Sequence, residues 1–119
     1  MEVRVFTLCD GAYNYNGKLT IVGTVDNIKV PKTPTLATIG IAAKIALAPN
    51  ETGKKNVTIN FKTINGELMM PEIAFEAETK DNLVIAGMID SLNIKEVGDC
   101  VVELTIGKTL LSLPFKIVK

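Results

Sequence analysis

Residues 36–48 are LATIGIAAKIALA, and this stretch decides between an all-β fold and one that contains a helix. Its alanines favour an α-helix, whereas Gly40 weakens one. Larger apolar residues and alanine occupy every second position: Ile39, Ile41, Ala43, Ile45 and Leu47. Alternation with a period of two is typical of a strand with one buried face. We therefore predict a strand over residues 36–48.

The same alternation recurs along the chain and predicts about eight short strands in all. The others cover residues 2–10, 18–25, 56–64, 67–79 with an interruption at Pro71, 83–90, 100–106 and 109–118. Turn signals separate them, among them a loop over residues 11–17 and Asn65-Gly66, which is typical of a type I′ hairpin turn. No amphipathic helix is evident. The sequence thus predicts an all-β fold, an antiparallel two-sheet β-sandwich that is immunoglobulin-like in kind, formed by residues 1–119 as a single domain.

The residue inventory argues against most catalytic chemistry. The 119 residues include no His, so Ser–His–Asp and Cys–His pairs and the commonest zinc ligand are absent. Gly11 to Lys18 is similar to a phosphate-binding loop, but its spacing is one residue too long and a strand follows it. We therefore expect no catalytic residues, no metal, no cofactor and no enzyme activity; an enzyme based on carboxylates or lysines is the least favoured alternative.

Charge and cysteine usage bear on partners and compartment. Thirteen Lys and Arg balance thirteen Asp and Glu, and Arg4 is the single arginine. Phosphate binding gains affinity from clustered cations, so we expect no nucleic acid as partner. The sequence shows no apolar run long enough to span a membrane and no secretory signal. Cys9 and Cys100 are expected to be reduced, buried thiols. These features predict a cytoplasmic protein without membrane contact.

Two groups of residues are candidates for ligand binding. Tyr13, Asn14 and Tyr15 lie in the predicted 11–17 loop, where they form an adaptable contact surface or cover the end of the sandwich. Asp10, Asp26 and Asp90 each end or follow a predicted strand. If they converge, they suit Ca²⁺ or glycoside hydrolysis; as ordinary turn residues they bond their own backbone.

An edge strand offers a different kind of contact. Residues 68–71, LMMP, combine adaptable methionines with a proline that is tolerated at a sheet edge. Such an edge can accept a strand from a protein partner or from a second copy of the chain. Core filling by the methionines is the alternative.

Two stretches resemble the ends of a bacterial family of small β-sandwich domains of unknown function. The first runs from Cys9-Asp10 through Asn16-Gly17-Lys18-Leu19 to Asp26-Asn27-Ile28, and the second from Val97-Gly98-Asp99 to Val118. Cys100 departs from the family pattern, in which an aromatic residue follows the turn. The shared motifs are glycines and strand alternation, so the resemblance implies a fold and no site.

Taken together, these features favour a non-catalytic cytoplasmic protein-binding or assembly module. The alternative is a small-ligand binding domain, with carbohydrate as one ligand class, that uses the 11–17 loop.

Overall fold

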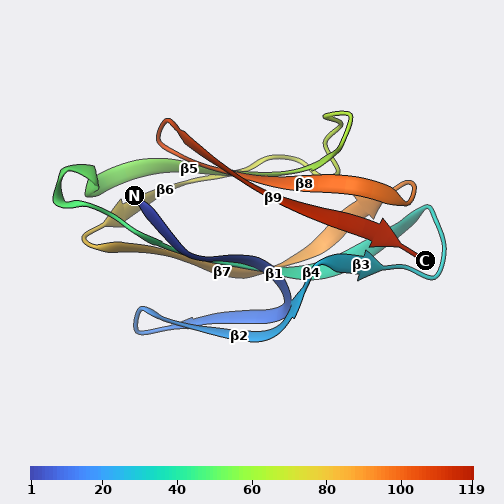
Figure 1. Ribbon diagram of the computed structural model, residues 1–119, viewed down its shortest axis with the longest axis horizontal. Helices are drawn as coiled ribbons and strands as arrows, with labels where there is room; N and C mark the ends of the chain where they lie inside the picture. Colours follow the sequence, from blue (N-terminus) through green and yellow to red (C-terminus); the bar gives the residue numbers. More distant parts are fainter.

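The computed structural model describes all residues 1–119 and contains nine strands and a short 3-10 turn at Pro49–Glu51. The strands are β1 (Glu2–Tyr15), β2 (Lys18–Val25), β3 (Asn27–Lys29), β4 (Thr35–Ala46), β5 (Gly53–Thr63), β6 (Ile73–Thr79), β7 (Asn82–Ile94), β8 (Gly98–Ile106) and β9 (Thr109–Val118). They form a four-stranded sheet of order β2-β1-β4-β7, here sheet A, and a five-stranded sheet of order β3-β9-β8-β5-β6, here sheet B (Figure 1).

The predicted all-β class and the two sheets are confirmed, with nine strands instead of about eight. Every strand pair is antiparallel except β3 with β9, which is parallel. The strand predicted over residues 36–48 is β4. The finer prediction, an immunoglobulin-like arrangement, stays a prediction.

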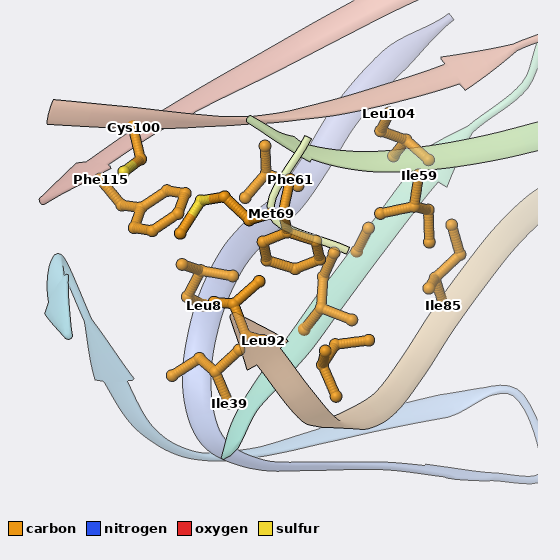
Figure 2. Packing of buried hydrophobic residues seen from close by; sticks show 14 of the residues in the cluster. Leu8, Ile39, Ile59, Phe61, Met69, Ile85, Leu92, Cys100, Leu104 and Phe115 are labelled. Atoms are coloured by element: carbon orange, nitrogen blue, oxygen red, sulfur yellow. The ribbon is translucent and has the colours of Figure 1, made fainter. Parts of the chain in front are cut away.

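Alternating apolar residues of both sheets meet between them and form the core. Its 23 buried residues include Ile41 and Ile45 of β4 and Phe61 of β5 (Figure 2). The rings of Phe61 and Phe115 meet edge to face, with centroids 6.2 Å apart. Burial of such apolar area is the main force that holds two sheets together.

Strand β1 bends and pairs with two neighbours in sheet A, β4 and β2. Its first part pairs with β4, and its second part, from Leu8 to Tyr15, pairs with β2. The β1–β2 hairpin folds back beneath the outer face of sheet A (Figure 1), where a small second cluster buries Cys9, Ala12 and Ala42. The approach is close, since a Cβ on Gly40 would lie 2.9 Å from the carbonyl oxygen of Cys9.

The loop predicted over residues 11–17 is wrong. Strand β1 continues to Tyr15, and the turn consists of Asn16 and Gly17 alone. Both residues have positive φ, 52° and 78°, as a type I′ turn requires. The amide of Gly17 also donates a 3.0 Å hydrogen bond to Oδ1 of Asn14, which fixes the turn.

The segment between β5 and β6 closes part of the gap between the sheets. The N–H of Met69 donates to the carbonyl oxygen of Phe61 at 2.8 Å, and the N–H of Asn93 donates to the carbonyl oxygen of Met69 at 3.0 Å. Met69 is 5% exposed and packs in the core. Of the two interpretations of residues 68–71, an open edge surface and core filling, Met69 therefore fits core filling.

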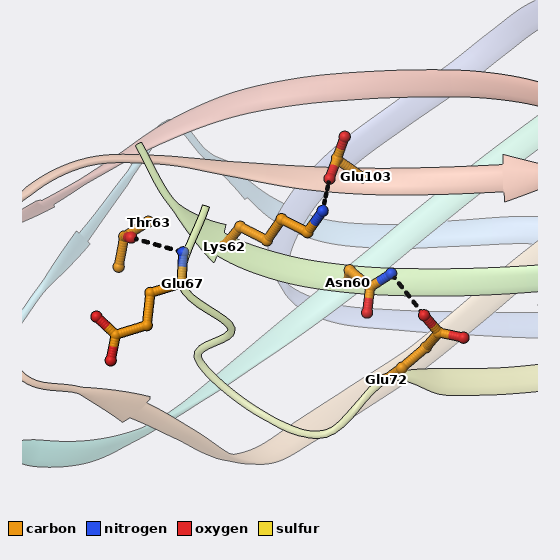
Figure 3. Close-up of polar contacts among 6 residues, drawn as sticks. All are labelled: Asn60, Lys62, Thr63, Glu67, Glu72 and Glu103. Atoms are coloured by element: carbon orange, nitrogen blue, oxygen red, sulfur yellow. Dashed lines mark hydrogen bonds and ion pairs between the residues drawn. The ribbon is translucent and has the colours of Figure 1, made fainter. Parts of the chain in front are cut away.

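The outer face of sheet B carries polar contacts beside this segment (Figure 3). Nζ of Lys62 lies 2.5 Å from Oε1 of Glu103 on the neighbouring strand. The side-chain amide of Asn60 donates to Glu72 at 3.0 Å, and the amide of Glu67 donates to Oγ1 of Thr63 at 3.2 Å. The ion pair joins β5 to β8, and the other two bonds tie the 64–72 segment to β5.

Candidate functional site

The two sheets are open on one side, between the edge strands β6 and β7. Strand β6 ends the order of sheet B and β7 ends that of sheet A. Between them lies an apolar groove of about 310 Å³, here called the β6–β7 slot. Its lining residues are Ile41, Ile59, Ile73, Phe75, Val84, Ile85, Ala86, Gly87 and Ile89.

The open edge of β7 lacks the usual protection against strand addition. Residues 83–89 are LVIAGMI, with neither a charged residue nor a proline. Natural edge strands commonly carry lysine, proline or a bulge to block pairing with another chain. The near end of β7 is joined to β6 by residues 80–81, and its far end is covered, where Asn93 bonds Met69. The stretch before it is therefore available as a template for an added strand.

Two residues give the slot its shape. Gly87 has no atom within 4 Å of the position that a Cβ would occupy, so the space above it is empty. Phe75 lies on β6 at the other rim and leaves 40% of its surface exposed. An empty space beside an exposed aromatic ring suits the insertion of a partner's side chain.

The charges near the slot are of both signs. From residue 72 to residue 90 the chain carries five acids and one cation, Lys80. The acids, all exposed, are Glu72, Glu76, Glu78, Asp81 and Asp90. Three further cations lie on neighbouring strands: Nζ of Lys54 is 3.9 Å from Glu76, Lys55 pairs across from Ala77, and Lys44 pairs across from Val84. Glu76 and Glu78 alternate with Phe75, which lines the slot, so these two acids point away from it on the outer face of sheet B.

The predicted ligand-binding residues of the β1–β2 hairpin lie away from any hollow. Tyr13 and Tyr15 are 62% and 73% exposed, and neither they nor Asn14 line any of the five surface hollows of the chain. The Tyr13 ring instead lies over Gly11, at 3.5 Å from the position of a Cβ there. Tyr13 therefore covers backbone and forms no wall of a pocket.

The three predicted carboxylates have three different settings. Asp10 lies over Gly23, where a Cβ would be 2.4 Å from Oδ2 of Asp10. Asp26 lines a cavity at one end of the sandwich, and Asp90 follows the open stretch of β7. No three Asp, Glu or Cys side chains come together in a group that could hold a metal ion. The structure thus does not unite Asp10, Asp26 and Asp90 in one site.

The end cavity has a volume of about 510 Å³ and mixed chemistry. Asp26, Asp99 and Lys116 lie around it, while Phe115 and Cys100 contribute apolar surface. Nζ of Lys116 is 4.0 Å from Oδ1 of Asp99, so the charges at its rim partly cancel.

Both cysteines are free and buried. Burial is the main cause that raises the pKa of the Cys9 thiol, and the nearby carboxylate of Asp10 also raises it. A hydrogen bond from the backbone amide of Gly11 lowers the pKa, but the net shift is upward. Burial also raises the pKa of Cys100, and Asp99 adds to the effect. A thiol reacts as its thiolate, so neither residue is set up as a nucleophile.

The β6–β7 slot was not among the predicted sites. The sequence does carry one signal for it, the uncharged run over residues 83–89 between Asp81 and Asp90. The run indicates a binding site only once the strand order is known, because the strand order places β7 at the edge of sheet A.

A model of the family of unknown function DUF6941 matches residues 4–118, nearly the whole chain. The chain belongs to the DUF6941 family. This finding confirms the predicted resemblance to small domains of unknown function. No curated protein matches the sequence of this DUF6941 chain.

Among solved structures, the DUF6941 chain is similar to the Pseudomonas fluorescens alkylpurine DNA glycosylase AlkC bound to DNA containing an abasic site analog. The TM-score is 0.61 at 11% sequence identity; the similarity covers 99% of the DUF6941 chain and 30% of the glycosylase chain. At this identity the likeness shows the fold alone. The DUF6941 chain spans less than a third of the glycosylase.

The glycosylase corrects one prediction. The balanced charge led us to expect no nucleic acid as partner, yet a protein that includes this fold was solved on DNA. Net charge describes the whole chain and does not describe local groups of cations. A net charge of zero was therefore insufficient reason to exclude nucleic acid as a partner.

No helix of the DUF6941 chain has the length and apolar character needed to cross a membrane.

Proposed function

We propose that this chain is a non-catalytic protein-binding module, on an immunoglobulin-like framework in the cytoplasm, that acts through the β6–β7 slot. The observation that carries the proposal is the uncharged, unpaired edge over residues 83–89 beside an apolar groove of about 310 Å³. Monomeric proteins rarely leave such a surface without a use.

The chemistry of the chain supports contact over catalysis. The sequence holds no His, and the pKa of both thiols is raised, which keeps them protonated near neutral pH. General acid–base catalysis relies on groups that titrate near the working pH.

Photo-crosslinking in the native host tests this function. A photoreactive amino acid replaces Met88, an exposed residue on the open stretch of β7, and in a control chain it replaces Leu110 of β9. The two side chains are similarly exposed, 43% and 54%. We expect a discrete protein adduct from position 88 and none from position 110. Equal labelling at both positions, or adducts that contain only nucleic acid, would overturn the proposal.

A second candidate function is DNA binding, favoured by the DNA-bound glycosylase. Strands β3 and β9 bring cations together at the opposite edge of sheet B, because Lys29 pairs with Val118 and Asn27 with Lys116. Lys119 follows directly. Titration of a duplex with an abasic site analog tests this candidate: an affinity that falls with salt and is lost in K29E/K116E supports it, and a K29E/K116E chain that binds as well as the native one refutes it.

A further inference from the structure

We propose that the partner of the β6–β7 slot is a second copy of this chain, whose β7 pairs antiparallel with β7 of the first copy about a two-fold axis at Ile85. The two four-stranded sheets A then join into one continuous sheet. This proposal rests on the proposed protein-binding function and names the partner.

Alternate residues of β7 direct their main-chain groups to the open edge. The N–H of Leu47 donates to the carbonyl oxygen of Asp81 at 2.8 Å, so Asp81 faces the β4 side. The register of β4 with β7 then runs unbroken from residue 82 to residue 89. Residues bonded to the neighbouring strand alternate with unbonded ones in an antiparallel pair. The residues whose N–H and C=O groups point to the open edge are therefore Asn82, Val84, Ala86 and Met88.

The far end of β7 follows the same alternation. The register of the two strands shifts by one residue between Ala37 and Ile39 of β4, which reverses the alternation beyond that point. Asn93 should then point to the open edge, and its N–H does bond there, to Met69. Met69 thus ends the free edge on one side, and the 80–81 connection to β6 ends it on the other.

One antiparallel register of two identical β7 edges pairs all four of the edge-facing residues. It places Asn82 opposite Met88 and Val84 opposite Ala86, and the symmetry repeats both pairs. Each of these pairs exchanges two main-chain hydrogen bonds. A shift of two residues in either direction removes Asn82 or Met88 from the set. The two-fold arrangement uses up both free edges, so it closes at a dimer.

The same register brings opposite charges together at both ends of the joined strands. Lys80 precedes the open stretch and Asp90 follows it, and both are exposed. With Ile85 on the axis, Lys80 of each copy lies opposite Asp90 of the other. Opposite charges in directly facing positions stabilise a strand pair, and complementary charge fixes its register. The presence of both signs beside the slot therefore makes this edge complementary to itself.

The apolar positions also match in this register. Ile85 lies opposite Ile85 of the second copy, in a pair without main-chain bonds, where side chains approach closely. Leu83 of the second copy lies opposite Gly87, where a Cβ would have no atom within 4 Å. A side chain at position 87 would compete with this leucine for the empty space. Pairing thus removes the apolar lining of the slot from water, which favours association.

Exchange of the charges at the two ends of β7 tests the inference. In sedimentation equilibrium, the native chain should change with concentration from the mass of one chain to twice that mass. Lys80→Asp sets like charges opposite each other and should raise the Kd of the dimer at least about tenfold. Lys80→Asp/Asp90→Lys restores opposite charges and should return the Kd to within about threefold of the native value. Positions 80 and 90 are roughly 30 Å apart along one extended strand, so this rescue requires two copies.

Two further variants locate the pairing edge. Lys108→Asp makes the same charge change in the turn between β8 and β9 and should leave the Kd unchanged. Ala86→Pro removes an N–H that points away from β4, a position at which an edge strand tolerates proline, so this chain should stay monomeric. Thermal unfolding checks that each variant is folded. The charge variants alter exposed side chains alone, so they test the register even when Ala86→Pro does not fold.

Four results would overturn the inference: a native chain that is monomeric at every concentration, no rescue of Lys80→Asp by Asp90→Lys, equal weakening by Lys108→Asp, or a dimer that persists in folded Ala86→Pro. Failure of the dimer and failure of the function are separable. An adduct of position 88 with a different protein, from a chain that sediments as a monomer, rejects the second copy and leaves the binding module. The absence of any protein adduct at position 88 rejects the binding module itself.

Discussion

The amide of Asn93 donates a 3.0 Å hydrogen bond to the carbonyl oxygen of Met69, and this bond joins the edge of sheet A to a segment that is bonded to sheet B. Met69 completes the link through its own amide, which bonds Phe61 of β5. The two sheets are therefore connected on this side at both ends of β7, by this bond at one end and by residues 80–81 between β6 and β7 at the other, and remain apart between them. The open slot is the part of the gap that Met69 does not close.

Removal of the Met69 side chain should be costly. Met69 is 5% exposed, so Met69→Ala leaves a cavity in the core and should lower the free energy of unfolding by about 2–5 kcal/mol. Met88→Ala is the matched control, since Met88 is 43% exposed and should change stability by no more than about 0.5 kcal/mol. Denaturant unfolding measures both; equal losses would contradict the role of Met69.

Gly23 should tolerate no side chain. Its φ is +62°, and a Cβ would lie 2.4 Å from Oδ2 of Asp10. Gly23→Ala should cost about 1–3 kcal/mol through backbone strain alone, and the clash adds to this cost. In an Asp10→Ala background the clash is removed and the strain remains, so the effect of Gly23→Ala should become smaller. An unchanged effect in that background would show that Asp10 does not constrain Gly23.

The half-buried ion pair between Lys62 and Glu103 on sheet B should stabilise the fold more than an exposed ion pair does. Lys62 and Glu103 are 2.5 Å apart, with 32% and 21% of their side chains exposed, whereas Lys54 and Glu76 are 3.9 Å apart and 72% and 59% exposed. Double-mutant cycles to Ala should give a coupling energy of about 1 kcal/mol for the first pair and less than about 0.5 kcal/mol for the second. The reverse order would contradict this description of the sheet face.

Both thiols should react slowly in the folded chain. Because their pKa values are raised above the ordinary 9.0, the thiolate is scarce at neutral pH, and burial hinders access. Alkylation should be fast only after unfolding. Rapid labelling of either cysteine at neutral pH in the native chain would show that the thiol is accessible and ionised.

The same shifts give a dependence of stability on pH. Above pH 9.0 the thiols of the unfolded chain lose protons that the folded chain retains, so stability falls as pH rises. Their contribution is complete below pH 9.0 and is lost as the pH rises through the raised values. Cys9→Ala/Cys100→Ala should show a smaller decline above pH 9.0 than the native chain, measured by urea unfolding at several pH values.

Strict alternation predicted β4 correctly although its composition favours a helix. Ile39, Ile41 and Ile45 are buried in the main core, as the period of two requires. The intervening Ala42 is also buried, because the folded-back β1–β2 hairpin covers the outer face of sheet A. Burial on both faces explains why this strand is so rich in alanine, and a covering hairpin cannot be read from alternation.

Turn residues were less informative than strand alternation. The glycine and asparagines of residues 11–17 predicted a loop, but Gly11 lies within β1 and only Asn16 and Gly17 turn the chain. At the second Asn-Gly pair, φ is positive at Gly66 and not at Asn65, so the predicted type I′ turn is wrong there. The same dipeptide serves different turns because its surroundings determine which residue takes the positive φ.

Residues 19–28 and 83–92 are weakly similar, which indicates either the shared composition of strands, the favoured interpretation, or equivalent positions in the two sheets. The second interpretation is wrong. Both strands lie in sheet A, at its opposite edges. Gly23 has positive φ and lies under Asp10, whereas Gly87 has ordinary φ and faces empty space. The two stretches are therefore similar in composition but different in structure: Gly23 is a strained glycine at one edge of sheet A, and Gly87 borders the open slot at the other.

The most direct measurement of the central claim is the yield of protein adducts from a photoreactive residue at position 88, compared between the native chain and Gly87→Val. Gly87→Val removes the empty space without altering the exposed rim. If a partner strand occupies the slot, the discrete adduct of the native chain disappears in Gly87→Val. An adduct that persists undiminished would contradict the claim that this chain acts through the edge of β7.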